Sequence, residues 1–357
     1  MIKRRKTKNI FYNNIGVGSD YPITVQSMTN TKTHNVEDTV NQIKKLQKAG
    51  CEIIRVAVPD MKAALALSKI KKQIEIPLIA DIHFDYKLAI KSIEQGVDGL
   101  RINPGNIGNK KRVEAVVKAA KQNEIPIRIG VNSGSIEKDL LNKYGKPTAE
   151  GMVESVIKHV RILEDFEFYN IVISMKSTDV LMTLKAHKIL SEKLDYPFHI
   201  GITESGSGKE GIIKSSVGLG LLLERGFGDT VRVSLTGDPV QEVYTAYEIL
   251  KTLKIRNRGI TIISCPTCGR TEVDLEKITK EVKNKIKKYH KDFENGLEVA
   301  VMGCAVNGPG EAREADLGIA CGKNKGILFK KGEIIKKVNE DEIIDVLIKE
   351  IKNMRSD

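Results

Sequence analysis

The sequence predicts an α/β protein, a (β/α)8 TIM barrel followed by a small α+β domain. Between residues 23 and 235, short β-rich segments alternate with amphipathic helical stretches, which is the pattern of parallel βαβ units. Eight such segments occur, and that number fits a closed barrel better than an open sheet, which would need edges and a switch point. After the basic stretch 254–258 the alternation stops, which indicates a second domain.

Each expected barrel strand is a short run rich in β-branched and other apolar residues. The eight runs are 23–28, 53–58, 78–82, 99–102, 127–131, 171–175, 198–202 and 231–235. The clearest intervening helices are 35–48, 86–95, 112–122 and 239–253. The first two end at Gly50 and Gly96, because glycine readily adopts the left-handed conformation that terminates a helix.

The second domain should be a small α+β unit, and we place its boundary between residues 255 and 256. Its expected elements are a strand at 260–263, a helix at 275–289, strands at 297–302 and 317–320, a hairpin through 331–332 and a helix at 341–353.

The composition limits the classes of partner. Fifty-eight Lys and Arg against 46 Asp and Glu give a net charge of +12, which favours acidic partners. The chain has no Trp, 5% aromatic residues and no recognisable nucleic-acid module, so nucleic acid is not expected. No apolar run reaches the roughly 18 residues of a membrane span, and the basic residues 3–6 precede no apolar signal core. We therefore expect a cytoplasmic protein that does not bind a membrane.

The carboxyl ends of the expected strands are unusually charged, and a barrel enzyme places its chemistry there. The polar residues at these ends are Arg55, Asp81, His83, Arg101, Asn103, Arg128, Asn132, Ser174, Lys176, Thr203, Glu204, Arg232 and Ser234. Four Arg and one Lys at one mouth would repel one another, and Asp81 and Glu204 cannot balance them. A ligand with two phosphate groups is the simplest compensation, since Arg binds phosphate oxygens bidentately.

Less specific interpretations of these residues remain open. A single Arg could point outward and pair with a helix acid such as Glu52, and His83 could be a satisfied core histidine. The recurrence of cations on successive strands favours a shared site. The chain has no GxxxxGK[ST] motif, so we do not predict a nucleotide.

The five cysteines, an odd number, argue for metal or redox chemistry rather than disulfides. Cys265 and Cys268 form a CxxC after one expected strand, and Cys304 follows another. A [4Fe-4S] cluster could use these three thiolates and leave one iron for an oxygen ligand such as Glu311. Zinc with Cys321 as fourth ligand, or an uncomplexed thiol pair, remains an alternative.

Seven segments resemble a known family. They are 22–31 (PITVQSMTNT), 54–58 (IRVAV), 80–84 (ADIHF), 101–105 (RINPG), 128–132 (RIGVN), 264–270 (SCPTCGR) and 302–312 (MGCAVNGPGEA). Their order and content closely resemble the 4-hydroxy-3-methylbut-2-enyl diphosphate synthases, over nearly the whole chain. The chain is similar to the short bacterial two-domain form, because no inserted domain separates Leu235 from Ser264.

The resemblance implies the reductive ring opening and dehydration of 2-C-methyl-D-erythritol 2,4-cyclodiphosphate in the non-mevalonate isoprenoid pathway. It implies a [4Fe-4S] cluster on Cys265, Cys268, Cys304 and Glu311, with flavodoxin or ferredoxin as the electron donor. The diphosphate-binding positions match Arg55, His83, Arg101, Asn103, Arg128, Asn132, Lys176, Arg232 and Ser234, and Ser174 is a further strand-end candidate. Glu204 and Glu311 are the catalytic candidates, with Glu204 offering a proton or a hydrogen bond. Cys321 stands where the family has Gly, which keeps the zinc interpretation open.

We therefore expect residues 1–255 to bind the substrate and residues 256–357 to hold the cluster. The last barrel helix should run toward the bottom of its own barrel, so a neighbouring chain could supply the cluster, and the resemblance likewise implies a head-to-tail homodimer. Two other functions stay open: a zinc-stabilised barrel lyase acting on a sugar phosphate, and a basic RNA-binding protein with a zinc ribbon.

Overall fold

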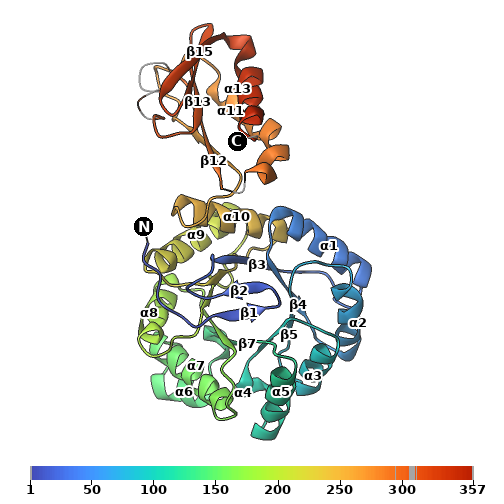
Figure 1. The fold of residues 1–357 in the computed structure, drawn as a ribbon. Helices are drawn as coiled ribbons and strands as arrows, with labels where there is room; N and C mark the ends of the chain where they lie inside the picture. The colour runs from blue at the N-terminus through green and yellow to red at the C-terminus, as the bar shows by residue number, and fades with distance from the viewer. Residues whose placement is uncertain (1, 294, 305–309, 311, 356–357) are drawn as a thin grey trace. The chain divides into compact units, whose positions relative to one another are not determined.

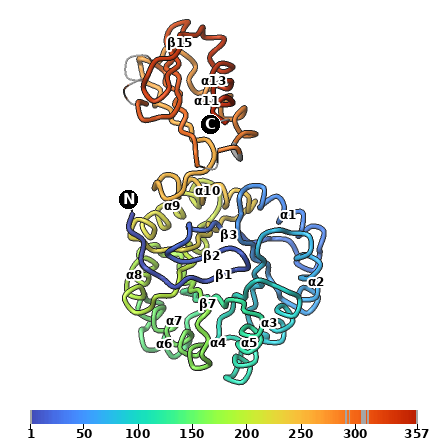
Figure 2. Tube along the Cα trace, viewed as in Figure 1, coloured from blue at the N-terminus to red at the C-terminus, as the bar shows by residue number. Residues whose placement is uncertain are grey.

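The computed structural model describes residues 2–293, 295–304, 310 and 312–355 (Figure 1). The chain divides into two compact units, residues 1–255 and 256–357. The backbone traces of both units are drawn in Figure 2.

The first unit is a closed barrel of eight parallel strands in the order β8-β7-β6-β5-β4-β3-β10-β9. The strands are β3 (Thr24–Met28), β4 (Ile53–Ala57), β5 (Leu78–Asp81), β6 (Gly99–Ile102), β7 (Ile127–Asn132), β8 (Ile171–Lys176), β9 (His199–Ile200) and β10 (Thr230–Val231). A parallel bridge between Ile173 and Phe198 joins β8 to β9, and Ile173 N donates to Pro197 O at 2.9 Å. The predicted (β/α)8 barrel is therefore confirmed.

Helices surround the barrel. They are α1 (Val36–Ala49), α2 (Met61–Lys71), α3 (Tyr86–Glu94), α4 (Pro104–Ile107), α5 (Lys110–Gln122), α6 (Lys138–Tyr144), α7 (Ala149–Glu164), α8 (Val180–Ser191), α9 (Gly208–Glu224) and α10 (Pro239–Thr252). Many of these helices are capped at the N-terminus by a short polar side chain. In α1, for example, the side chain of Asn35 accepts a hydrogen bond from Asp38 N, and Gly50 ends the helix with a left-handed φ of 113°. None of the described helices is long and apolar enough to cross a membrane.

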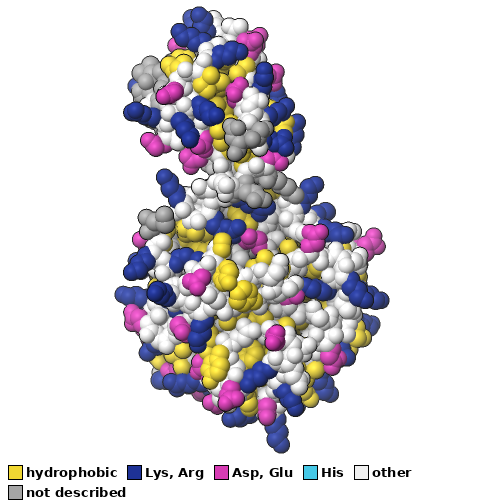
Figure 3. All heavy atoms as spheres, in the orientation of Figure 1, with side chains coloured by type: hydrophobic (Ala, Val, Ile, Leu, Met, Phe, Trp, Pro, Cys, Tyr) yellow, Lys and Arg dark blue, Asp and Glu magenta, His cyan; other side chains and the backbone are white. Residues whose placement is uncertain are grey.

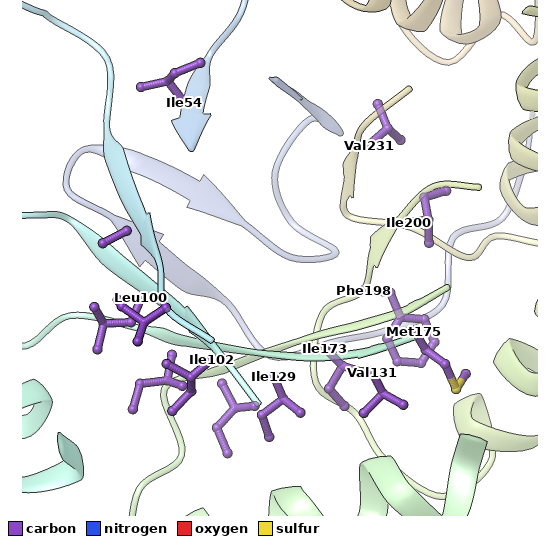
Figure 4. Close-up of a cluster of buried hydrophobic side chains, with 14 of the residues drawn as sticks. Ile54, Leu100, Ile102, Ile129, Val131, Ile173, Met175, Phe198, Ile200 and Val231 are labelled. Atoms are coloured by element: carbon purple, nitrogen blue, oxygen red, sulfur yellow. The ribbon is translucent and has the colours of Figure 1, made fainter. Parts of the chain in front are cut away.

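The main hydrophobic core lies between the strands and the helices. Alternate strand residues such as Ile54, Ile102, Ile129 and Ile173 are buried in it (Figure 4). Because side chains alternate across a strand, the residues between them face the barrel interior. That interior is available for polar side chains, while the outer layer supplies the apolar burial that stabilises the fold.

A short hairpin closes one end of the barrel, and the sequence analysis did not predict it. Strands β1 (Ile10–Tyr12) and β2 (Ile15–Val17) pair antiparallel, and Figure 1 shows them crossing the barrel. Their side chains pack against inward-facing Ile53, Ile79 and Val172, which come from the beginnings or first halves of barrel strands. The hairpin therefore plugs the end opposite the carboxyl ends of the strands.

The second unit is a five-stranded mixed sheet with two long helices. Its elements are β11 (Ile260–Ser264), α11 (Leu275–Ile286), β12 (Leu297–Met302), β13 (Leu317–Gly322), β14 (Lys325–Lys330), β15 (Glu333–Asn339) and α13 (Ile343–Asn353). The first three strands are parallel, β14 pairs antiparallel with β13, and β15 pairs antiparallel with β14. Both helices contribute to one core cluster with β12 and β13. The helix expected at 275–289 ends as α-helix at Ile286 and continues as 3-10 helix.

Changing Gly99 to Ala should destabilise the first unit. A Cβ at Gly99 would lie 2.5 Å from Tyr12 Cε1, so the plug must shift, and overpacking of this kind typically costs about 1–3 kcal/mol. Urea unfolding of wild type and variant measures the difference. The matched control is Gly220→Ala in α9, where a Cβ meets nothing within 4 Å, and we expect no loss of stability. Equal stability of the Gly99 variant and wild type would show that the hairpin is not packed tightly into the barrel.

Candidate functional site

The inward-facing positions toward the carboxyl ends of the barrel strands form a cationic cluster. Asp81 on β5 pairs in register with Arg101 on β6, which pairs in register with Arg128 on β7. Asn132 on β7 pairs in the same way with Lys176 on β8. Residues that are direct partners on neighbouring parallel strands point to the same side, so the fold brings these predicted site residues together.

Two inward-facing glycines make room for the long cations. A Cβ at Gly130 would lie 2.2 Å from Arg101 Nε. A Cβ at Gly201 would lie 2.5 Å from Arg232 O and 2.7 Å from Lys176 Nζ. Any larger residue would therefore displace a cation from the site. The sequence did contain a signal for these close contacts: a glycine inside a predicted strand often marks a place where another group approaches the backbone.

Asp81 holds one side of the cluster. Its carboxylate lies 3.3 Å from Arg101 Nη1, 3.6 Å from Arg55 Nη1 and 3.7 Å from His83 Nε2. Burial alone would raise the pKa of Asp81, but Arg55, a hydrogen bond with His83 and Arg101 hold that pKa well below its usual range. Asp81 is therefore ionised and anchors two guanidinium groups.

Glu242 on α10 holds the other side, and sequence reasoning missed it. Its carboxylate accepts from Ser27 Oγ at 3.2 Å and from Leu235 N at 3.0 Å. Arg232 Nε lies 3.5 Å from Glu242 Oε2, an ion pair without hydrogen-bond geometry. Glu242 lies in the first turn of α10, where acidic residues are common because they interact favourably with the helix dipole. The sequence therefore gave no reason to separate Glu242 from an ordinary helix-terminal acid.

Arg128 lies deepest in the cluster, with 0% of its surface exposed. It donates through Nη1 to Gln26 of β3, a second residue that the sequence analysis missed. Its Nε and Nη2 find no hydrogen-bond partner among the described residues. Burial, together with Arg55, lowers the pKa of Arg128 to about 9, so the guanidinium stays charged at neutral pH with donors unsatisfied.

Lys176 is also buried, and it faces the four arginines. Burial and then the charges of Arg232, Arg55, Arg128 and Arg101 lower the pKa of Lys176 well below its usual value. An anion at this point would reverse that effect, because it would supply the opposite charge that the cluster lacks. The arrangement is suited to binding a multiply charged phosphate group.

The other predicted residues occupy the same strand ends. Asn103 is buried and caps α4, accepting from Gly105 N at 3.0 Å. The side chain of His83 is 56% exposed, so it is no core histidine but lies at the rim. Glu204 is exposed in the loop after β9, with a left-handed φ of 51°. The remaining two candidates, Ser174 and Ser234, are buried and half-buried respectively.

The cysteine motifs meet at the ends of two neighbouring parallel strands. Ser264 on β11 pairs in register with Val301 on β12, so Cys265 and the residues that precede Cys304 leave the sheet at the same edge. Gly303 N donates to Cys265 Sγ at 3.2 Å, which ties one motif to the other. Such N–H donors stabilise thiolates that bind a metal centre.

Cys268 is exposed, in the turn that follows Cys265. Its backbone oxygen accepts from Thr271 N at 2.9 Å, and Glu272 N donates to Gly303 O at 3.4 Å, so the turn packs against the Cys304 segment. A hydrogen bond from the Arg270 backbone lowers the pKa of the Cys268 thiol. The side chain is therefore disposed toward the thiolate form.

The other proposed ligands are placed differently. Glu311 lies outside the described residues. Cys321 is fully buried within β13, where burial raises the pKa of its thiol to about 12, so it packs as an apolar residue. Within the described residues no three His, Cys, Asp or Glu side chains form a ready-made metal site. The three cysteines that the sequence singled out nevertheless supply the donors that an iron-sulfur cluster requires.

Two family models match the chain: the GcpE TIM-barrel domain over residues 7–247 and the GcpE protein C-terminal domain over residues 261–353. A relative from Thermodesulfovibrio yellowstonii is 57% identical over 99% of this chain and 100% of its own length. A relative from Clostridium perfringens is 56% identical over 99% of this chain and 100% of its own. Both are named 4-hydroxy-3-methylbut-2-en-1-yl diphosphate synthase (flavodoxin).

Among solved structures, dihydropteroate synthase from Stenotrophomonas maltophilia superimposes with a TM-score of 0.52 at 14% identity. The match covers 70% of this chain and 97% of that one. At this identity the likeness supports the barrel fold alone.

Changing Lys176 to Met should stabilise the ligand-free protein by about 1–4 kcal/mol, the range seen when a buried ionic group gives way to an apolar one. Because the pKa of Lys176 is lower in the folded state, the unfolded chain binds more protons between the two pKa values. Wild-type stability should therefore rise with pH in the alkaline range below the ordinary lysine pKa, and this slope should be flatter in the variant. Urea unfolding across that range measures it.

Inorganic pyrophosphate is the control ligand for this prediction. It should stabilise wild type more than the Lys176 variant, because the variant has lost one of the cations that bind it. A variant that is less stable than wild type and equally protected by pyrophosphate would remove Lys176 from the cationic cluster.

Proposed function

The chain belongs to the GcpE family of 4-hydroxy-3-methylbut-2-en-1-yl diphosphate synthases, and we propose that it produces this diphosphate from 2-C-methyl-D-erythritol 2,4-cyclodiphosphate. The reaction takes up two electrons and two protons, opens the cyclic diphosphate and releases one water. The observation that carries the proposal is the set of buried guanidinium groups in the barrel whose hydrogen-bond donors lack partners among the described residues. The zinc lyase and the RNA-binding protein find no support among the relatives.

The barrel cluster would bind the cyclic diphosphate. Arg55, Arg101, Arg128, Lys176 and Arg232 provide the charge, and the unpartnered Nε and Nη2 of Arg128 and Nε of Arg55 provide donors that phosphate oxygens would satisfy. The remaining strand-end residues would complete the pocket with further donors and acceptors. They are His83, Asn103, Asn132, Ser174 and Ser234. Asp81 and Glu242 orient the guanidinium groups without neutralising the whole cluster.

The second unit would hold a [4Fe-4S] cluster on Cys265, Cys268, Cys304 and Glu311. When bound, such a cluster supplies single electrons and a Lewis-acidic iron, which amino-acid side chains cannot provide. The Gly303 N–H donated to Cys265 Sγ would help to keep that sulfur ionised. Glu204, exposed after β9, would offer a proton or a hydrogen bond to the opening ring.

We further infer that the protein is a cytoplasmic homodimer that receives electrons from flavodoxin or ferredoxin. The names of the two relatives specify flavodoxin. Apolar side chains are exposed on the outer face of α9 and α10. They are Ile212, Ile213, Val217 and Tyr244, with exposed fractions from 37% to 62%. A face of this kind is typical of a subunit contact. Lys and Arg are spread over the visible surface of both units, which suits an acidic donor (Figure 3).

Replacing Cys265, Cys268 or Cys304 with Ser should abolish both the cluster and the activity, because each would supply a thiolate to iron. Iron and sulfide analysis of protein purified without oxygen, with the absorbance near 400 nm, measures the cluster directly. The matched control is Cys321→Ser, which removes a buried thiol and should leave iron content unchanged. One zinc and no iron in wild type would refute the proposal, and loss of iron in the Cys321 variant would make it a fourth ligand.

Mixed dimers test whether the sites are shared between chains. Arg55→Met should inactivate the barrel and Cys265→Ser the cluster, so each homodimer should be inactive. If one chain's cluster serves the partner's barrel, verified heterodimers of the two variants should regain part of the activity, since one complete pair of sites is restored. Activity assays on tagged, co-purified heterodimers measure this. Heterodimers that stay inactive would show that each cluster serves the barrel of its own chain.

A further inference from the structure

A cavity of about 540 Å³ lies in the second unit between the end of β11 and helix α11. On the strand side it is bordered by Ser264, Cys265 and Thr267. On the helix side its lining is Leu275, Glu276, Thr279, Lys280, Lys283, Asn284 and Lys287. One end of this cavity is therefore formed by the first cysteine of the CxxC motif.

Three lysines line the helix side at positions that share one face. Lys280, Lys283 and Lys287 are three and four residues apart, the spacing of neighbours on a helix surface. A neighbouring face of α11 is buried in the core through Val282 and Ile286. The lysines are thus held by a well-anchored helix and are themselves exposed.

These lysines lack intramolecular counter-charges. Within the described part of the chain none of the three forms an ion pair, and Lys287 Nζ donates to the neutral Asn284 Oδ1 at 3.1 Å. Lys285, on the far side of the same helix, does pair with Asp345 at 2.8 Å. The cavity lining itself contributes one carboxylate, Glu276, against three ammonium groups. The charge of this face is available for a partner.

A polar group in the cavity wall also lacks a partner. Thr279 Oγ1 is buried and makes no hydrogen bond to any described residue. A buried hydroxyl without a partner is costly unless another molecule satisfies it. Thr279 belongs to the same cavity lining as the three lysines.

We propose that this lysine face, defined as Lys280, Lys283 and Lys287, is the docking site for a small acidic electron-carrier protein of the flavodoxin type. The inference rests on the proposed function, because only a redox enzyme needs such a partner. Carboxylates of the carrier pair with the lysines, and the cavity brings the carrier's redox group toward Cys265. Charge complementarity of this kind orients a transient encounter and accelerates it.

The test compares two triple variants with the same change in charge. Lys280→Glu, Lys283→Glu and Lys287→Glu together reverse the docking face. Lys330→Glu, Lys336→Glu and Lys337→Glu reverse exposed lysines of β14 and β15 in the same unit. Calorimetric titration with flavodoxin measures binding, and turnover is measured with reduced flavodoxin and, separately, with dithionite, a small reductant that needs no docking.

We expect the docking-face variant to bind flavodoxin about tenfold or more weakly, and its flavodoxin-driven turnover to fall accordingly. Dithionite-driven turnover and iron content should stay at wild-type levels, and the β14–β15 variant should behave as wild type in every assay. Wild-type affinity for flavodoxin should also fall as salt is raised.

Two results would overturn the docking site. One is unchanged flavodoxin binding by the docking-face variant. The other is an equal loss of dithionite-driven turnover, which would mean that this face contacts the substrate-binding barrel. Absence of turnover and of iron in wild type would instead refute the proposed function, and the binding titration would still decide the docking site.

Discussion

The crowding of five cationic side chains inside one barrel is the constraint on which the rest of the structure depends. Like charges removed from water are tolerated only when they are paired, neutralised or matched by a ligand. Asp81 and Glu242 hold parts of the cluster, and Gly130 and Gly201 leave the space that its long side chains need. The main apolar core lies between strands and helices, and inside the barrel apolar packing is found where the hairpin meets Ile53, Ile79 and Val172.

Both proposed sites use the same property of parallel strands. Their carboxyl ends lie at one edge, so residues distant in sequence meet there without any special loop design. In the barrel this places Asp81, Asn132 and Lys176, the last residues of their strands, at one end, and in the second unit it brings the Cys265 and Cys304 segments together. A reaction that needs a bound diphosphate and single electrons can thus be divided between two compact units.

Most of the fold follows from local patterns, and the parts that do not have identifiable causes. The eight strands were found from their apolar runs, although two of them are shorter than expected: β9 and β10 have two residues each. The hairpin β1–β2 was missed, since its strands have three residues each and turn at Asn13, whose φ is 53°. Its stability comes from plugging the barrel, a contact that no local pattern reports.

The sequence by itself determined the barrel, the cations at its strand ends and the cysteine motifs, because β-alternation, residue type and spacing are local properties. Only the tertiary structure decided which groups face one another. Gln26 and Glu242 contact Arg128 and Arg232 across more than one element, so neither could be selected from its own neighbourhood. The burial of Cys321 likewise depends on α13 packing over β13, because burial is a property of the assembled core and not of the chain.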